Sequence, residues 1–144
     1  MLNQYLIFAP LLAMILLTAI VLLWMYRTRI GEIRKLKINP QQLADHEEGK
    51  ALLKNVAGPS DNFSNLFESP VIFYVAILTI FSTQTGDNTL LSIAWIYVIL
   101  RYLHSFIHCS YNKVMHRFKV YLMGTFVLWL MWILIAFKLI EKIS

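Results

Sequence analysis

The sequence has little charge, little cysteine and few residues that break helices. Of its 144 residues only 15% are charged, and it contains 5 glycines, 4 prolines and 1 cysteine. By contrast, 58% are hydrophobic and the mean hydropathy is +0.61. This balance excludes an ordinary soluble domain and indicates a membrane protein with several spans. The single cysteine, Cys109, excludes an internal disulfide framework and a multi-cysteine metal site.

The positive net charge does not indicate a nucleic-acid partner. The formal charge is +5, but the basic residues cluster beside the hydrophobic runs, where such residues set topology and meet lipid headgroups. Nothing else in the sequence supports nucleic-acid binding. The first hydrophobic run, Met1–Tyr26, lacks the positive start and the small-residue cleavage site of a signal peptide. We therefore expect it to be retained as the first span.

Four hydrophobic segments predict four membrane-spanning helices in a single domain over residues 1–144. The expected spans cover about residues 2–26, 62–82, 90–110 and 120–137, with a polar connection over 27–61. Pro10 and Pro70 are expected to kink the first two spans. Ser60 or Asp61 is expected to cap the second. The predicted fold class is all-α, an integral membrane four-helix bundle that runs up-down-up-down.

The charges between the spans predict the orientation of the bundle. The connections after the first and third spans are basic, whereas the short connection over residues 83–89 has no basic residue. Lysine and arginine are enriched in cytoplasmic connections. We therefore expect both basic connections in the cytoplasm and both termini on the opposite side.

The second span contains polar residues at membrane depth. The apolar run from Val71 to Ser82 is about 18 Å long at the rise of an α-helix, whereas the hydrocarbon core of a bilayer is about 30 Å thick. The helix must therefore begin near Asn62, which places Asn65 and Glu68 within the membrane. An ionisable residue at this depth is costly to bury and marks a functional site by default.

The third span has the same shortage of apolar length. Its helix must continue through Arg101 and His104. Counting outward from the turn places Glu68 level with Arg101, and Asn65 level with His104 or Ser105. Two interpretations remain open for these residues. Either Glu68 and Arg101 form a buried ion pair that fixes the register of the two helices, or the polar side chains form a pocket for a small charged ligand.

Two residues of the third span could suggest a metal site. His104 and His108 are one helical turn apart, but a metal needs at least a third ligand, and only this helix supplies histidines at that depth. We therefore expect no metal site and no haem. Cys109 lacks a clear activating partner, so we expect it to be an unreactive packing residue.

Some of these residues are arranged as in a known family. The pattern N-x-x-E at Asn65 and Glu68, followed by Pro70, and the Arg101-Tyr102 pair resemble the MAPEG family, the membrane-associated proteins of eicosanoid and glutathione metabolism. The resemblance covers essentially the whole chain, including the long first connection. It implies a left-handed four-helix bundle that assembles as a homotrimer in a bacterial inner membrane. It also implies glutathione as co-substrate, bound between subunits near the cytoplasmic face.

The resemblance implies roles for individual residues. The expected substrate-binding residues are Asn65, Glu68, Arg101, Tyr102, Arg27, Arg29 and His104. Arg27 or Arg29 would come from a neighbouring subunit. Arg117 or Lys113 would be the catalytic residue that lowers the pKa of the thiol. The chain departs from the family at Asp61, where many members have an arginine, and its polar run around His104 resembles a bacterial branch.

The leading hypothesis is a membrane-embedded protein that binds glutathione or another small thiol. If catalytic, it would be a transferase or peroxidase acting on lipophilic electrophiles or lipid hydroperoxides drawn from the bilayer. The alternative is a non-catalytic member that binds lipid or a protein partner. A third hypothesis, a small ion-coupled transporter subunit, is the least favoured because the chain has no paired repeats.

Overall fold

The computed structural model describes residues 4–143, apart from the side chain of His46. The α-helices are α1 (Phe8–Leu36), α2 (His46–Leu52), α3 (Ala57–Asn65), α4 (Ser69–Thr83), α5 (Asn88–Cys109) and α6 (Val114–Ile143). The short 3-10 helices are η1 (Gln4–Ile7), η2 (Pro40–Ala44) and η3 (Lys54–Val56). No strand occurs within residues 4–143, which confirms the predicted all-α class.

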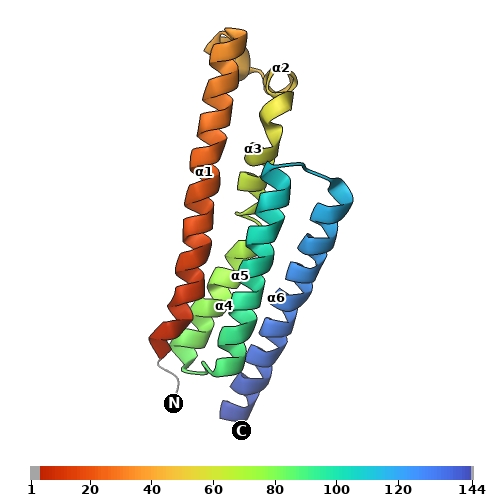
Figure 1. The fold of residues 1–144 in the computed structure, drawn as a ribbon. Helices are drawn as coiled ribbons and strands as arrows, with labels where there is room; N and C mark the ends of the chain where they lie inside the picture. The colour runs from red at the N-terminus through yellow and green to blue at the C-terminus, as the bar shows by residue number, and fades with distance from the viewer. Residues whose placement is uncertain (1–3, 144) are drawn as a thin grey trace.

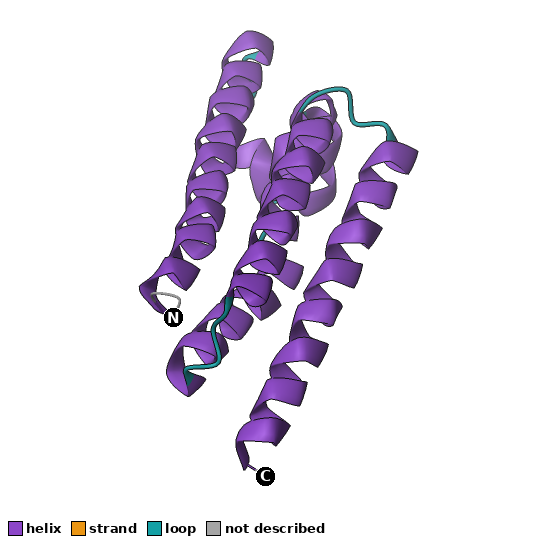
Figure 2. Ribbon diagram, turned by 60° about the horizontal axis from the view of Figure 1, so that its bottom comes forward, coloured by secondary structure: helices purple, strands orange, loops and turns teal. Residues whose placement is uncertain are grey.

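The long helices form an antiparallel bundle with α5 in its middle (Figures 1 and 2). α5 packs against α1, α3 and α6, and α4 packs against α1 and α6. Both described chain ends lie at the bottom of Figure 1, beside the turn over residues 84–87. We call this the turn end of the bundle. The opposite end carries residues 37–56, and we call it the connection end.

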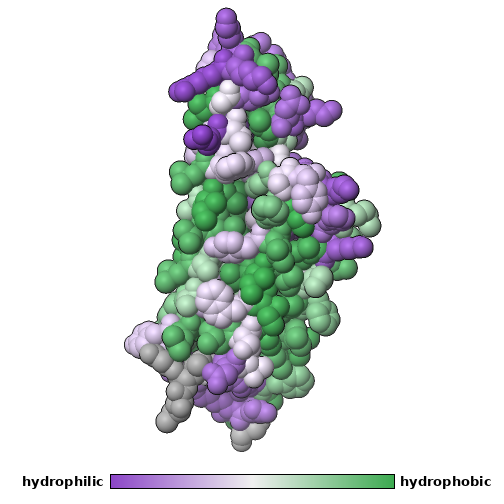
Figure 3. Space-filling model, in the orientation of Figure 1, coloured by the Kyte–Doolittle hydropathy of each residue, from purple (hydrophilic) through white to green (hydrophobic). Residues whose placement is uncertain are grey.

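The chain has four segments long and apolar enough to cross a membrane. They are Gln4–Leu36, Lys54–Thr83, Asn88–Cys109 and Val114–Ile143. Figure 3 shows a hydrophobic surface over the middle of the bundle and hydrophilic side chains at its two ends. The prediction of an up-down-up-down bundle with four spans is confirmed. The protein is an integral, multi-pass membrane protein.

The helices around the first connection extend further than predicted. α1 continues to Leu36 and ends at Lys37, which adopts the left-handed conformation, and α3 begins at Ala57. The expected connection over 27–61 is therefore too long at both ends, because apolar length does not limit a helix that emerges from the membrane. The expected cap at Ser60 or Asp61 is wrong, since both lie inside α3. Residues 2 and 3 of the expected first span lie outside the described chain.

Proline acts differently in the first two spans. Pro10 lies in the first turn of α1, directly after η1, where its missing amide is no loss. Pro70 lies at the start of α4, and the second span is broken just before it, between Asn65 and Ser69. A proline ring clashes with the carbonyl four residues earlier, which in this chain belongs to Leu66. The expected kink is therefore a complete break at residues 66–68.

The backbone at the break keeps its hydrogen bonds. The amides of Phe67 and Glu68 donate to the carbonyls of Ser64 at 3.0 Å and Asn65 at 3.4 Å, and the amide of Val71 donates to the Glu68 carbonyl at 3.1 Å. Irregular backbone at membrane depth is tolerated only when its polar groups are paired in this way. The break gives α3 a direction independent of α4, so the polar residues of α3 can approach α5.

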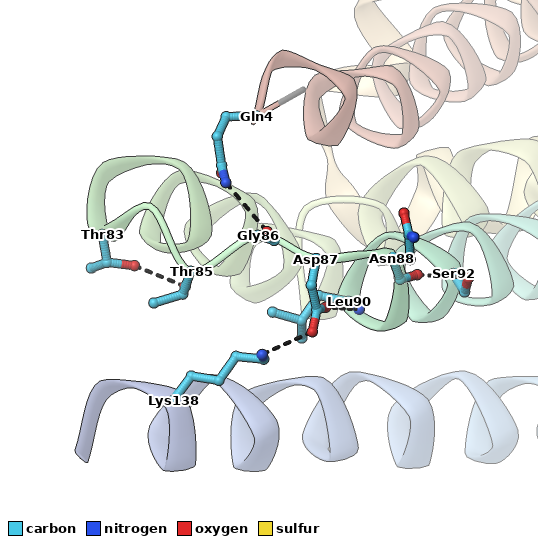
Figure 4. A network of polar contacts seen from close by, with 9 residues as sticks. All are labelled: Gln4, Thr83, Thr85, Gly86, Asp87, Asn88, Leu90, Ser92 and Lys138. Atoms are coloured by element: carbon cyan, nitrogen blue, oxygen red, sulfur yellow. Dashed lines mark hydrogen bonds and ion pairs between the residues drawn. The ribbon is translucent and has the colours of Figure 1, made fainter. Parts of the chain in front are cut away.

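The turn end is held by a small polar network around Asp87 (Figure 4). The Asp87 carboxylate accepts from the Leu90 amide at 2.8 Å, which caps α5, and pairs with the Lys138 ammonium at 2.8 Å. The Gln4 side chain donates to the Gly86 carbonyl at 3.2 Å. Burial acts to raise the pKa of Asp87, but the Leu90 amide and the Lys138 ammonium outweigh it and hold the pKa below its usual value.

Removing this carboxylate should change the stability of the protein at neutral pH and its dependence on pH. Because the folded-state pKa of Asp87 is lowered, its stabilisation is present above the usual pKa and is lost as pH falls toward the folded value. Asp87→Ala should cost about 1–2 kcal/mol at pH 7, from the lost cap and a half-exposed ion pair. Asp87→Asn should keep most of the stability that comes from capping α5. It should lose only the part of the stability that depends on pH in acid. Thermal melts in detergent between pH 3 and 7 measure both effects; identical pH profiles for wild type and Asp87→Asn would contradict the assignment.

Candidate functional site

A polar cluster joins α3, α5 and α6 near the connection end. Arg117, in the first turn of α6, lies beside His108, in the last turn of α5. Arg117 Nη1 donates to His108 Nε2 and to Asn112 Oδ1, both at 2.9 Å. His108 Nε2 also lies 3.3 Å from Asn65 Nδ2 of α3. We call Asn65, His108, Asn112 and Arg117 the mouth cluster.

The loop between α5 and α6 brings these side chains together. The amide of Asn112 donates to the Ile107 carbonyl at 2.9 Å, and Asn112 adopts a positive φ of 47°. Asparagine tolerates this left-handed conformation better than most residues. The chain therefore reverses within residues 110–113, and α6 starts with Arg117 facing the end of α5.

The partners of the two buried histidines define their tautomers. A guanidinium can only donate, so His108 Nε2 must accept from Arg117 and the ring proton must lie on Nδ1. His104 Nδ1 lies 3.2 Å from the Arg117 carbonyl, which can only accept, so this nitrogen carries the proton. His104 Nε2 and His108 Nδ1 are buried and have no hydrogen-bond partner within the described chain. Both rings therefore hydrogen-bond to Arg117 through their other nitrogen and hold it in place.

A second amide, not singled out from the sequence, supports the cluster from inside the bundle. Asn62 is fully buried; it accepts from Ser105 Oγ at 3.3 Å, and its Nδ2 donates to Cys109 Sγ at 3.5 Å. These bonds fix α3 against α5 one turn from Asn65. Asn62 lies among other polar residues of α3, so nothing in the sequence distinguished it from its neighbours. The thiol of Cys109 is thus a hydrogen-bonded packing group, as expected.

The expected ion pair between Glu68 and Arg101 is wrong. Arg101 is only 2% exposed, and its guanidinium lies 5.0 Å from the ring centroids of both Tyr97 and Tyr121. Its Nε and Nη2 have no hydrogen-bond partner among residues 4–143. Glu68 lies exposed at the break of the second span. Counting residues outward from the turn did not give the right depths, because residues 66–68 are not helical.

The same break explains why Asn65 contacts His108 rather than His104 or Ser105. Asp61, one turn earlier on α3, is exposed and close enough to His108 to interact with it electrostatically. Asp61 is thus one turn before Asn65 on α3, and Glu68 is exposed at the break that follows α3.

The other expected site residues are distributed around the bundle. Tyr102 donates its hydroxyl to the Ala13 carbonyl of α1 at 2.8 Å, on the side of α5 away from α6. Arg29 donates to Ser60 Oγ of the same chain at 3.2 Å. Arg27 and Lys113 are exposed. Of the expected catalytic and binding residues, the structure brings together Asn65, Arg117 and the enclosed His104.

An apolar groove runs along α1 and α5 behind the mouth cluster. It has a volume of about 460 Å³. Its lining residues are Leu17, Ile20, Val21, Trp24, Tyr102, Ser105, Phe106, Cys109 and Ser110. Phe106 is 68% exposed on this side. A hydrocarbon from the bilayer can enter this groove without desolvating any charged side chain.

Comparison with family models gives one decisive result. The model of the MAPEG family matches residues 7–137, which is nearly the whole chain. The chain belongs to the MAPEG family. Comparison with curated proteins and with solved structures gave no match.

Membership in the MAPEG family confirms the resemblance noted at Asn65, Glu68 and the Arg101-Tyr102 pair. It assigns the chain in general terms to membrane proteins of glutathione and eicosanoid metabolism, a family whose members generally use glutathione. Within this MAPEG chain, Asn65 of the N-x-x-E pattern contacts His108, whereas Glu68 faces outward.

Proposed function

We propose that this protein binds glutathione, or a similar small thiol, at the mouth cluster. The observation that carries the proposal is the state of Arg117. Its guanidinium is half-buried, its side-chain hydrogen bonds go to the neutral groups of His108 and Asn112, and no described carboxylate pairs with it. Such an arginine is held in a fixed position with its charge available to an anion.

The surrounding charges suit the ligand. Glutathione carries two carboxylates, one ammonium and a thiol. Arg117 would bind an anionic group, either a carboxylate or the thiolate, and Asn65 would hydrogen-bond the peptide backbone. Glu68, exposed at the break that follows α3, would receive the ammonium.

The chemistry would join this site to the apolar groove. Arg117 beside the sulfur would favour the thiolate, and the thiol proton would pass to solvent. The thiolate sulfur would then form a bond to the electrophilic carbon of a lipophilic molecule, whose leaving group or neighbouring atom takes the displaced electron pair. With a lipid hydroperoxide, the thiolate would instead attack the terminal peroxide oxygen, so that an S–O bond forms as the O–O bond breaks. The lipid leaves as its alkoxide and takes a proton from solvent, and a second glutathione converts the resulting sulfenic acid to the disulfide with release of water.

The proposed assembly is a homotrimer with both termini outside the cytoplasm of a bacterial cell and the mouth cluster on the cytoplasmic side. The basic connections at the connection end support this orientation. In a trimer, Arg27 of one subunit would lie near the exposed Glu68 face of the next. Lys113 remains the second candidate for activating the thiol. Arg101 and Tyr102 are not part of the proposed site, because their side chains are engaged elsewhere.

A thermal-shift experiment tests binding. Glutathione at millimolar concentration should raise the melting temperature of the detergent-solubilised protein. Arg117→Gln should weaken glutathione binding about tenfold, because a charged hydrogen bond is lost. Arg34→Gln, a matched loss of one arginine charge at an exposed position of α1, should leave glutathione binding unchanged. No shift for the wild type, or equal losses in both variants, would contradict the proposed site.

A conjugation assay separates catalysis from binding. The same variants are incubated with glutathione and an electrophilic aryl halide, and the thioether product is measured. Product formation that depends on Arg117 supports a transferase. Binding without conjugation or peroxide reduction would support the alternative, a non-catalytic member.

A further inference from the structure

A second polar site lies between α3 and α1. A pocket of about 270 Å³ lies between α1, α2 and α3 at the connection end. It is lined by two cations, Arg29 and Lys50, and by two carboxylates, Asp45 and Asp61. This combination suits a ligand that carries both a negative and a positive group.

The charges in this pocket are not neutralised by one another. Arg29 is half-buried and donates Nη1 to the Ser60 hydroxyl at 3.2 Å. Asp45 uses one oxygen, Oδ1, to cap α2. Within the described residues no ion pair joins Arg29 or Lys50 to a carboxylate. The two cations can therefore bind an external anion, and Asp61 can bind an external cation.

An apolar groove lies along the same two helices, deeper in the membrane. It has a volume of about 460 Å³. Its lining residues are Leu11, Ile15, Thr18, Ala19, Leu22, Phe63, Leu66, Phe67 and Tyr74. The Thr18 hydroxyl donates to the Met14 carbonyl at 3.0 Å, so its polar group is satisfied within α1. The groove is suited to hydrocarbon.

The pocket and the groove share one face of α1. Arg29, Leu22, Ile15 and Leu11 are separated by seven, seven and four residues, which places them in one row along a helix. From Arg29 to Leu22 the helix rises about 10 Å, and from Leu22 to Leu11 about 16 Å. A charged pocket thus stands directly above an apolar channel of acyl-chain length.

The pocket lies at the depth of lipid headgroups. Trp24 and Tyr26 are exposed on α1 between the groove and Arg29. Such residues gather at the boundary between the hydrocarbon core and the headgroup layer. The groove is therefore level with the acyl chains of the bilayer and the pocket is level with the phosphates.

We propose that this crevice is a specific site for one phospholipid whose headgroup ends in a primary ammonium, as in phosphatidylethanolamine. Arg29 and Lys50 bind its phosphate, Asp61 binds its ammonium, and one acyl chain lies in the groove between α1 and α3. The match of both headgroup charges to the pocket favours a lipid over a second copy of the chain. The site is distinct from the proposed thiol site, because Asn65 contacts His108 of α5, Arg117 belongs to α6, and neither residue lines the crevice.

The test measures lipid retention by native mass spectrometry, after delipidated protein is incubated with mixed micelles of detergent and one phospholipid. Phosphatidylethanolamine should bind in a one-to-one ratio and more tightly than phosphatidylglycerol, which has the phosphate but no ammonium. Arg29→Gln should weaken binding about fivefold, the effect expected for one basic residue near a lipid surface. Asp61→Asn should remove the preference for phosphatidylethanolamine.

Two matched controls locate the site. Arg27→Gln removes the same charge from an exposed position of α1 outside the crevice and should leave lipid binding unchanged. Ala19→Trp fills the groove and should abolish one-to-one retention, whereas Leu16→Trp, exposed outside it, should not. Equal losses for Arg29→Gln and Arg27→Gln would overturn the proposal. So would cross-linking of Ala19→Cys to another copy of the chain, which would show that a subunit fills the groove.

Discussion

Gly58→Ala should destabilise the protein more than the same methyl addition at Gly31, Gly49 or Gly124. A Cβ atom at Gly58 would lie 2.8 Å from the backbone carbonyl oxygen of His108, whereas at the other three positions it would meet no atom closer than 3.5 Å. Because that oxygen belongs to the end of α5 and not to a flexible side chain, α3 and α5 must move apart. Overpacking of this kind costs about 1–3 kcal/mol. We expect a loss near the upper end, since the hydrogen bonds of Asn62 to α5 lengthen at the same time.

The consequence of this substitution extends to the mouth cluster. Separation of α3 from α5 should move Asn65 away from His108, so the glutathione-induced thermal shift should fall together with the melting temperature. Gly31→Ala is the matched control, because nothing lies within 4 Å of a Cβ at that position of α1. It should leave stability unchanged or raise it by up to about 1 kcal/mol. Similar melting temperatures for the two variants would contradict the close contact between α3 and α5.

Arg101→Ala should lower the free energy of unfolding by about 3 kcal/mol or more, whereas Arg101→Met should cost little. The arginine fills a space between the rings of Tyr97 and Tyr121 and lies against Gly124, whose position would place a Cβ 3.7 Å from its Nε and Nη2. Truncation to alanine leaves a cavity and removes both cation–π contacts. Methionine restores most of the volume and removes a buried charge that has no carboxylate partner in the described chain.

A double-mutant cycle separates this account from a buried ion pair. Glu68→Gln should leave the free energy of unfolding of the delipidated, monomeric protein nearly unchanged. Its coupling energy with Arg101→Met should be close to zero. If the two residues were paired inside the membrane, loss of one partner would cost about 3–5 kcal/mol, and the cycle would show strong coupling. A strong coupling energy would therefore refute the arrangement around Tyr97 and Tyr121.

Most of the architecture could be predicted from local properties of the chain. Apolar runs flanked by polar connections were enough to identify four spans, because the membrane leaves the backbone few alternatives to a helix. The position of Pro70 indicated a kink in the second span, which the structure shows as a complete break. The N-x-x-E pattern at Asn65 and Glu68 indicated the family, which the match over residues 7–137 confirms.

Other features depended on how helices rotate and tilt against one another. Sequence spacing placed Arg101 on a polar face, but the packing of α6 encloses it with Tyr121 and Gly124. The break at residues 66–68 redirects α3, so Asn65 meets His108 and Glu68 remains exposed.

The sequence by itself therefore determined that this is a four-span MAPEG protein with polar groups at membrane depth. Only the tertiary structure decided that Arg117, and not Arg101, is the arginine held beside Asn65 with its charge available. The physical reason lies in the range of the interactions. Hydrophobicity and proline act within a helix, whereas the partner of a polar side chain depends on the helix that packs against it.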